Sequence, residues 1–275
     1  MNTEDYIISL FSKTSSCIGD DGCVKDRLVY SQDAFFENVH FKYSWMTPFQ
    51  IAYKSMIVNI SDAIAMNAVP KYALLSVAVP SSMSRLEISQ LHDGFTKAAD
   101  EFGIEIIGGD TISNIKLDIS VTVVSNTAKP LTRKGIRKGD LIAYTGDLGR
   151  SKRDLKRLLR GYKVSSQSRF IKPELRSKFI FSTAKYLSAG MDISDGLLTE
   201  MGRLSKINTL NFKLYSKLNK SLACSGEEYE MLITFSPRHL KRIKQEAKKS
   251  RTPLNVIGVA VRGKFGYKCK AQHFK

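Results

Sequence analysis

Two short segments place carboxylates inside apolar runs that are otherwise suited to burial. They are "NISDAIAM" at 59–66 and "MDISDGLL" at 191–198, and both contain Ile-Ser-Asp. In each, the serine is suited to cap a following helix, and the aspartate after it would lie in a first turn, where the helix dipole favours a negative charge. Asp192 has no such role, so capping explains only part of the pattern.

Acidic residues beside glycine, at expected strand ends or at expected helix starts recur through both halves of the chain: Asp20, Asp21, Asp33, Asp62, Asp110, Asp192 and Asp195. Taken singly, each is explained by turn formation or by helix capping. Together they can converge on one cleft, where they would repel one another unless a cation lies among them. Oxygen ligands without histidine or cysteine suit Mg²⁺, which commonly joins carboxylates to substrate phosphates. The joint pattern therefore indicates phosphoryl-transfer chemistry.

Other motifs for nucleotide binding or catalysis fail. Gly258–Lys264 fits G-x-x-x-x-G-K, but Phe265 stands where a P-loop needs Ser or Thr. The chain has neither G-x-G-x-x-G nor G-x-S-x-G, and four histidines are few for a serine-nucleophile enzyme. The four cysteines lack C-x-x-C spacing, which favours reduced thiols over a zinc site or a disulfide framework: Cys17, Cys23, Cys224 and Cys269.

The elements that must position these residues mix strands and helices throughout. Apolar patterns predict strands at 27–32, 71–79, 115–124, 140–146, 229–235 and 255–261. Helical patterns cover 61–68, 84–102, 150–160, 176–189, 195–206 and 238–249, the second of them stopped by Gly103. We expect an α+β (mixed α/β) fold. The basic, glycine-punctuated stretch 126–140 predicts a boundary between a domain at 1–128 and a domain at 129–275.

Bulk composition is that of a soluble globular protein with an unusually basic charge. The 275 residues are 43% hydrophobic and carry a formal net charge of +17, much of it at 150–163 and 238–251. No run reaches membrane-spanning length and the N-terminus is acidic, so we expect a cytoplasmic protein without a membrane partner. Because no nucleic-acid module accompanies the charge, solvated helix faces are favoured over a nucleic-acid surface.

Seven ordered blocks resemble the thiamine-monophosphate kinase family, within the superfamily of aminoimidazole ribonucleotide synthetase. The blocks are "IGDDGCV" (18–24), "SQDAFFENVHF" (31–41), "NISDAIAMNAVP" (59–70), "IIGGDTISN" (106–114), "LTRKGIRKGDLIAYTGDLG" (131–149), "MDISDGLLTEMGRL" (191–204) and "SGEEYEMLITF" (225–235). The resemblance implies a two-domain, synthetase-like fold with a dimerising N-terminal sheet domain and a C-terminal α+β domain. It implies ATP- and Mg²⁺-dependent phosphorylation of thiamine monophosphate to thiamine diphosphate by direct transfer, in a homodimer.

The resemblance also implies roles for individual residues. The Mg²⁺ ligands would be Asp21, Ser31, Asp33, Asp62, Asp110, Asp192 and Asp195. The ATP contacts would be Gly109, Asp110, Arg133 and Ser194. His40 and Glu227 would hold the thiamine substrate, and no residue would act as a covalent nucleophile.

The chain departs from the family pattern at its C-terminal end. Ala271 stands where relatives carry an aromatic that stacks on the substrate, and Tyr267 or Phe274 are the candidate replacements. Two alternatives remain open at this point. One is another synthetase of the superfamily, such as a selenophosphate synthetase, although "GCVK" at 22–25 is only a loose imitation of its reactive loop. The other is a non-catalytic nucleic-acid-binding protein whose basic helices follow phosphates, which would bind with a steep salt dependence.

Overall fold

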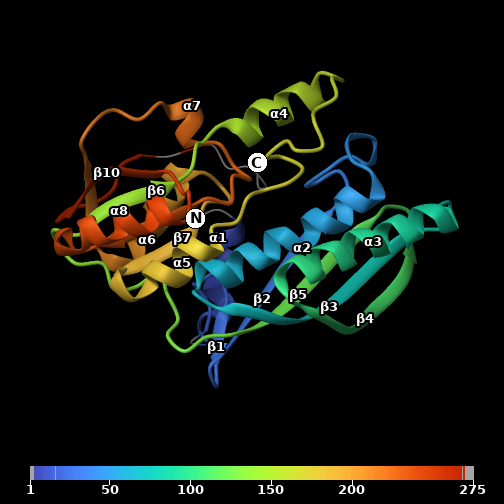
Figure 1. Ribbon diagram of the computed structural model, residues 1–275, viewed down its shortest axis with the longest axis horizontal. Coiled ribbons are helices and arrows are strands. Elements are labelled where there is room, and N and C mark those ends of the chain that lie inside the picture. The colour runs from blue at the N-terminus through green and yellow to red at the C-terminus, as the bar shows by residue number, and fades with distance from the viewer. Residues whose placement is uncertain (1–2, 16, 268, 270–275) are drawn as a thin grey trace.

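The computed structural model describes residues 3–15, 17–267 and 269, and it contains two five-stranded sheets with helices packed on them (Figure 1). The mixed α/β class expected from the sequence is confirmed. None of the helices in the described part of the chain combines the length and the apolar character needed to cross a bilayer.

In chain order the helices and strands are α1 (Thr3–Phe11), β1 (Cys23–Lys25), β2 (Leu28–Phe36), α2 (Pro48–Ala65), β3 (Val69–Pro80), α3 (Arg85–Phe102), β4 (Glu105–Asn114), β5 (Asp118–Asn126), β6 (Leu141–Thr145), α4 (Arg150–Leu159), α5 (Ser177–Thr183), β7 (Ala189–Asp192), α6 (Leu197–Asn208), β8 (Asn211–Leu214), α7 (Lys220–Ala223), β9 (Met231–Phe235), α8 (Leu240–Lys249) and β10 (Leu254–Val261). Three short 3₁₀ turns lie at Tyr43–Trp45, Ala184–Tyr186 and Pro237–His239.

The first sheet has the order β1-β2-β5-β3-β4, antiparallel except for the parallel pair β3 and β4. Alternate side chains of β5 point into the core, with Ile119, Val121 and Val123 fully buried. Helices α2 and α3 lie side by side on this face of the sheet (Figure 1). Strand β4 is one edge of the sheet, and its residues are almost all exposed.

Both helices over the first sheet begin with a capping box. Thr47 caps α2 together with Gln50, and Pro48 fills the first helical position. Ser84 caps α3 together with Glu87, and Gly103 ends α3 in the left-handed conformation with φ 65°. The expectation of a helix over 84–102 stopped by Gly103 is therefore confirmed.

The second sheet has the order β7-β9-β6-β10-β8 and is covered on both faces. Apolar residues of α5 and α8 pack with one side of β6 and β9, whereas α6 packs with the other side. The first of these layers is continuous with the core under α2, so one apolar core joins the two sheets. Residues 127–140 connect β5 to β6 without a regular element.

Several local expectations are wrong. Ser61 does not begin a helix, because α2 starts at Pro48 and Ser61 lies in its last turns. The stretch 176–189 is a short helix and a 3₁₀ turn rather than one long helix. The cysteines are not reduced thiols, since Cys17 pairs with Cys23 and Cys224 pairs with Cys269. These pairs form although the chain has no C-x-x-C spacing: Cys17 and Cys23 lie only six positions apart in the chain, and the fold brings together Cys224 and Cys269, which are 45 positions apart.

Candidate active site

A cavity of about 350 Å³ lies where α2 meets β2 and the C-terminal end of β7. One stripe of α2 runs along it, because Lys54, Val58 and Asp62 are four residues apart and therefore share a helix face. Val58 and Asp62 line the cavity, and Lys54 contacts it through Glu227. The other lining residues are Ile8, Asp20, Asp21, Gln32, Asp33, Ala34, Phe35, His40, Arg133, Asp192, Ser194, Asp195, Arg203, Glu227 and Tyr229.

Strand β2 supplies the wall opposite α2. Residues two apart on a strand share a face, so Ser31, Asp33 and Phe35 all point toward α2. Asp33 lines the cavity, and its carboxyl has a pKa raised to about 6 by burial and by the neighbouring charges of Asp21 and Asp195. Ser31 lies deeper, where its hydroxyl donates to Asn59 Oδ1 at 2.6 Å.

Strand β7 ends at the cavity with Asp192, whose carboxylate accepts a hydrogen bond from the Ser61 hydroxyl at 2.7 Å. This bond joins the two Ile-Ser-Asp segments directly. The following turn passes through Gly196, with φ 106°, where an added Cβ would lie 3.1 Å from the backbone of Cys224. Glycine is therefore needed for the turn that carries Ser194 to lie against the segment that carries Glu227.

The loop before β1 brings Asp21 to the same place, where it forms an ion pair with Arg133. The backbone N–H of Arg133 also donates to Asp20 Oδ1 at 2.6 Å, and its guanidinium donates to Gly19 O at 3.3 Å. These bonds hold residue 133, from the connection between the sheets, against the loop. Arg133 Nε is buried and has no hydrogen-bond partner among the described residues.

Three carboxylates meet at this end of the cavity. Oxygens of Asp21, Asp62 and Asp192 all lie within 4.8 Å of one another. The pKa values of Asp62 and Asp192 are raised well above the ordinary value, first by burial and then by the nearby aspartates. Burial also raises the pKa of Asp21, against the opposing charge of Arg133. Such mutual repulsion is what a bound divalent cation relieves, and an all-carboxylate donor set fits Mg²⁺.

Glu227 and His40 line the same cavity. Glu227 has φ 55° and its N–H donates to Ser194 O at 2.6 Å, while its Oε2 accepts from Lys54 Nζ at 2.7 Å. His40 Nδ1 accepts the Phe36 N–H at 3.0 Å, so the proton of the neutral imidazole is on Nε2. The cavity thus combines three converging carboxylates, whose chemistry suits a cation, with one further carboxylate and one imidazole.

The structure brings most, but not all, of the sequence-predicted residues together. Nine line the cavity: Asp21, Asp33, His40, Asp62, Arg133, Asp192, Ser194, Asp195 and Glu227. Ser31 does not line it, and neither do Gly109 and Asp110. The last two lie on the exposed edge strand β4, where Asp110 Oδ1 accepts the N–H of Thr111 at 2.9 Å.

The residues near the cavity that the sequence prediction missed include Lys54, Arg203 and Tyr229. Arg203 pairs with Asp195 at 2.7 Å and with Glu200 at 2.8 Å, and it follows Asp195 by two helical turns. Lys54 carries a signal that could have been used, because it is the only charged residue in the apolar stretch 48–61.

Both disulfides flank the cavity. Cys17–Cys23 closes the loop that contains Asp21, and Cys224 is three residues before Glu227. Tyr267 is exposed and packs near Phe265. Ala271 and Phe274, which the sequence analysis considered for substrate stacking, lie outside the described residues.

The basic residues of α4 lie elsewhere. They line two grooves, of about 480 and 620 Å³, that share no residue with the acidic cavity. The concentration of positive charge in this helix is therefore separate from the carboxylate cluster.

Residues 19–126 match the family model described as AIR synthase related protein, N-terminal domain. The thiamine-monophosphate kinase of Nitrosopumilus maritimus is 32% identical in an alignment over 236 residues, and the match covers 78% of this chain and 76% of that protein. The thiamine-monophosphate kinase of Aquifex aeolicus is 31% identical in an alignment over 259 residues, and the match covers 83% of this chain and 84% of that protein.

A solved structure described as AaThiL complexed with AMPPCP and TMP superposes with a TM-score of 0.86 at 27% identity. The alignment covers 100% of this chain and 98% of that chain. The similarity therefore extends over both sheets and over the cavity between them.

Proposed function

The chain belongs to the thiamine-monophosphate kinase family, and we propose that it transfers the γ-phosphoryl group of ATP to the phosphate of thiamine monophosphate. The products are thiamine diphosphate and ADP, so the reaction is the last step in making thiamine diphosphate. The resemblance seen in the sequence and the synthetase-like fold are both confirmed. The observation that carries the proposal is one cavity lined both by three converging carboxylates and by Glu227 and His40.

Asp21, Asp33, Asp62, Asp192 and Asp195 would hold Mg²⁺. Mg²⁺ held there would supply positive charge against the phosphate oxygens of the substrates. The protein's own part is to bring these carboxylates to one cavity from the loop before β1, from β2, from α2, and from β7 and the turn after it. A protein nucleophile is not required, because an oxygen of the substrate phosphate attacks the γ-phosphorus directly.

The remaining cavity residues would bind the two substrates. Arg133 suits a phosphate, because it lines the cavity beside the carboxylate cluster and carries a charge opposite to that of a phosphate. Ser194 would contact the nucleotide from the turn after β7. Glu227 would accept from donor groups of the thiamine moiety, and His40 Nε2–H would donate to it.

A homodimer explains the placement of Gly109 and Asp110. These two residues lie on the exposed edge strand β4, and they would reach a nucleotide in a site completed by a second copy. Exposed apolar side chains on the same sheet, among them Tyr72, Leu74 and Ile112, supply a face that a second copy would cover. The two-domain division at residue 128 and a cytoplasmic location stay predictions.

The test of the function is an assay of the purified protein with Mg²⁺, ATP and thiamine monophosphate, with thiamine diphosphate and ADP both quantified. We expect equal amounts of the two products and no thiamine diphosphate when Mg²⁺ is removed. Thiamine and selenide serve as alternative acceptors. ATP turnover with either of them, together with none on thiamine monophosphate, would contradict the proposal.

The test of the dimer is complementation between two inactive variants, Asp62→Asn and Asp110→Asn. If one site takes Asp62 from one copy and Asp110 from the other, a mixed dimer has one intact site and one doubly altered site. Random mixing then restores about a quarter of wild-type activity. No recovery, in a preparation that is dimeric by light scattering, would place both residues in the same copy's site.

A further inference from the structure

Lys54 carries a buried charge that the proposed phosphoryl transfer does not use. Its side chain is 0% exposed in the middle of α2. Burying an ammonium group is costly unless the charge is paired, so a buried lysine needs a specific reason for its place. Burial lowers the pKa of Lys54, and the adjacent carboxylate of Glu227 opposes this effect.

Three contacts fix the Lys54 ammonium. Its Nζ donates to Glu227 Oε2 at 2.7 Å, lies 3.8 Å from the ring centroid of Phe170 and lies 5.5 Å from that of Phe35. The two rings stabilise the cation while excluding water from the ion pair. Glu227 itself is 19% exposed and lines the cavity, so the pair reaches from the core to the cavity wall.

The same contacts reach the second candidate thiamine-binding residue. The ring of Phe35 stacks on the imidazole of His40 with centroids 5.7 Å apart. Lys54 therefore contacts Glu227 directly and reaches His40 through the ring of Phe35.

The position of Lys54 along α2 separates it from the carboxylate cluster. It precedes Asp62 by eight residues, which is two helical turns or about 12 Å along the helix axis. A change at Lys54 should therefore act on Glu227 and His40 and leave the cluster of Asp21, Asp62 and Asp192 in place.

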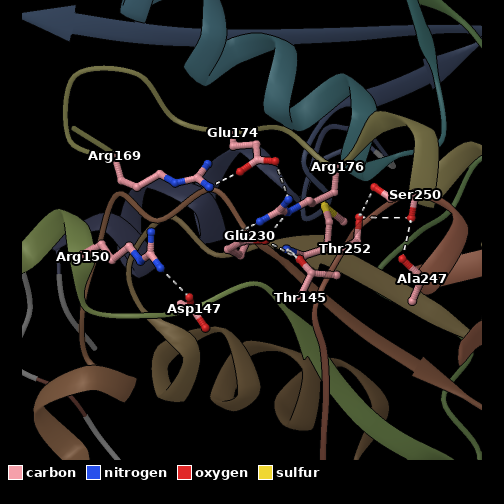
Figure 2. Close-up of polar contacts among 11 residues, drawn as sticks. Thr145, Asp147, Arg150, Arg169, Glu174, Arg176, Glu230, Ala247, Ser250 and Thr252 are labelled. Atoms are coloured by element: carbon pink, nitrogen blue, oxygen red, sulfur yellow. Dashed lines mark hydrogen bonds and ion pairs between the residues drawn. The ribbon is translucent and has the colours of Figure 1, made fainter. Parts of the chain in front are cut away.

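A second buried network lies beside the Lys54–Glu227 ion pair. Figure 2 shows Arg176 and Thr145 both directed at Glu230, which accepts two bonds from Arg176 at 2.6 and 2.7 Å and one from Thr145 at 2.7 Å. Arg176 closes the loop that contains Phe170, and Glu230 is three residues after Glu227. Arg176 and Glu230 therefore join the loop that carries Phe170 to the segment that carries Glu227 without the help of Lys54.

We propose that Lys54 is a positioning residue that holds the Glu227 carboxylate, and through Phe35 the His40 ring, in place to bind the thiamine moiety. The inference rests on the proposed function, since that function gives Glu227 and His40 their ligand. Its ammonium is directed at Glu227 and two aromatic rings, so the proposal gives Lys54 no role in the transfer step itself.

The test is a double-variant cycle of Lys54→Met, Glu227→Gln and the pair together, assayed with Mg²⁺, ATP and thiamine monophosphate. We expect Lys54→Met to raise KM for thiamine monophosphate by about tenfold or more, with KM for ATP and kcat changed less than about threefold. The double variant should lose clearly less than the sum of the two single effects, because Lys54 acts mainly through Glu227 and only in part through Phe35. Lys172→Met is the matched control, because its ammonium also lies over an aromatic ring of α2, that of Tyr53, at 5.6 Å, but outside the cavity.

Equal changes in KM for both substrates, or additive effects in the double variant, would overturn the proposal. If Lys54→Met does not fold, Lys54→Gln replaces it, and an unchanged KM for thiamine monophosphate in that variant also overturns the proposal. Urea unfolding of the same cycle without substrate measures the Lys54–Glu227 coupling by itself. A coupled pair in a wild-type protein that is inactive on thiamine monophosphate means that the proposed function fails. An active wild type with Lys54→Met unaffected means that only this inference fails.

Discussion

Replacing Asp62 by Asn separates a metal-binding role from a structural one. Asp62, Asp21 and Asp192 have carboxylate oxygens within 4.8 Å of one another. Two full charges at this distance repel by about 3.5 kcal/mol at an effective dielectric constant of about 20. Asp62→Asn removes two of the three pairs, although the raised pKa values of Asp62 and Asp192 already relieve part of the repulsion. We therefore expect the metal-free variant to be more stable than the wild type, by about 1 kcal/mol or roughly 2 °C in Tm.

The same substitution should have the opposite effect on activity and on metal binding. Loss of one carboxylate from the cluster should lower kcat by about 100-fold or more, which is about 2.7 kcal/mol of transition-state stabilisation. Mg²⁺ at 100 times its Kd should stabilise the wild type by about 2.7 kcal/mol. The variant should lose most of this gain, which differential scanning fluorimetry with and without Mg²⁺ measures.

The matched control is Asp147→Asn, which removes one aspartate from a surface ion pair with Arg150, where the Asp147 side chain is 63% exposed. It should change neither kcat nor the Mg²⁺-induced shift in Tm. A metal-free Asp62→Asn protein that is clearly less stable than the wild type would refute the reasoning, because it would mean that Asp62 is an internal structural group. Full activity in Asp62→Asn would refute it equally.

Three further predictions follow from the same geometry. His40→Ala should raise KM for thiamine monophosphate by about tenfold while leaving KM for ATP unchanged, and steady-state kinetics with each substrate varied will show whether the two separate. In metal-free protein, the free energy of unfolding should fall as pH rises from about 4 through the folded-state pKa of Asp33 near 6, because the folded chain holds a proton that the unfolded chain has released. Urea titrations at pH 4.5 and 7.5 in EDTA test this sign. Asp33→Asn should make the dependence of the unfolding free energy on pH less steep. Arg176→Met should destabilise the protein by about 3–5 kcal/mol, since it leaves the Glu230 carboxylate buried without its partner (Figure 2), and urea unfolding should show that adding Glu230→Gln recovers part of the loss.

Elements with a clear period could be predicted from the sequence, and those buried on all sides could not. Helix α3 has polar and apolar faces and both caps, so its bounds are predicted almost to the residue. Helix α2 is buried nearly all round, so it has no amphipathic period, and only its final turns were predicted. The sequence nevertheless contains a signal for the start of α2, because Thr47-Pro48 followed by Gln50 is a capping box with proline at the first helical position.

Strand β4 could not be predicted for a different reason, its low local strand propensity. Gly108, Gly109 and Asp110 are poor strand formers, so local propensity does not indicate a strand there. Pairing with β3 over nine residues supplies what propensity lacks. In the candidate site, residue types and the family resemblance identified the acids, but the Ser61–Asp192 bond and the Lys54–Glu227 pair join distant segments that no local pattern connects.

The place of Asp62 is itself an argument for a cation. The sequence pattern suggested that Asp62 begins a helix, where the dipole would stabilise its charge. It lies instead in the last turn of α2, where the partial charge of the helix end is negative and disfavours a carboxylate. Two other acids, Asp21 and Asp192, lie beside it, and both raise its pKa. Burial, the helix end and the neighbouring acids thus oppose an ionised Asp62. The charge of Arg133 favours it, but Arg133 already pairs with Asp21. A divalent cation is the partner that would reverse this balance, so Mg²⁺ affinity should fall more steeply below pH 6 than it would for isolated carboxylates, a trend that isothermal titration of Mg²⁺ across pH 5 to 8 will measure.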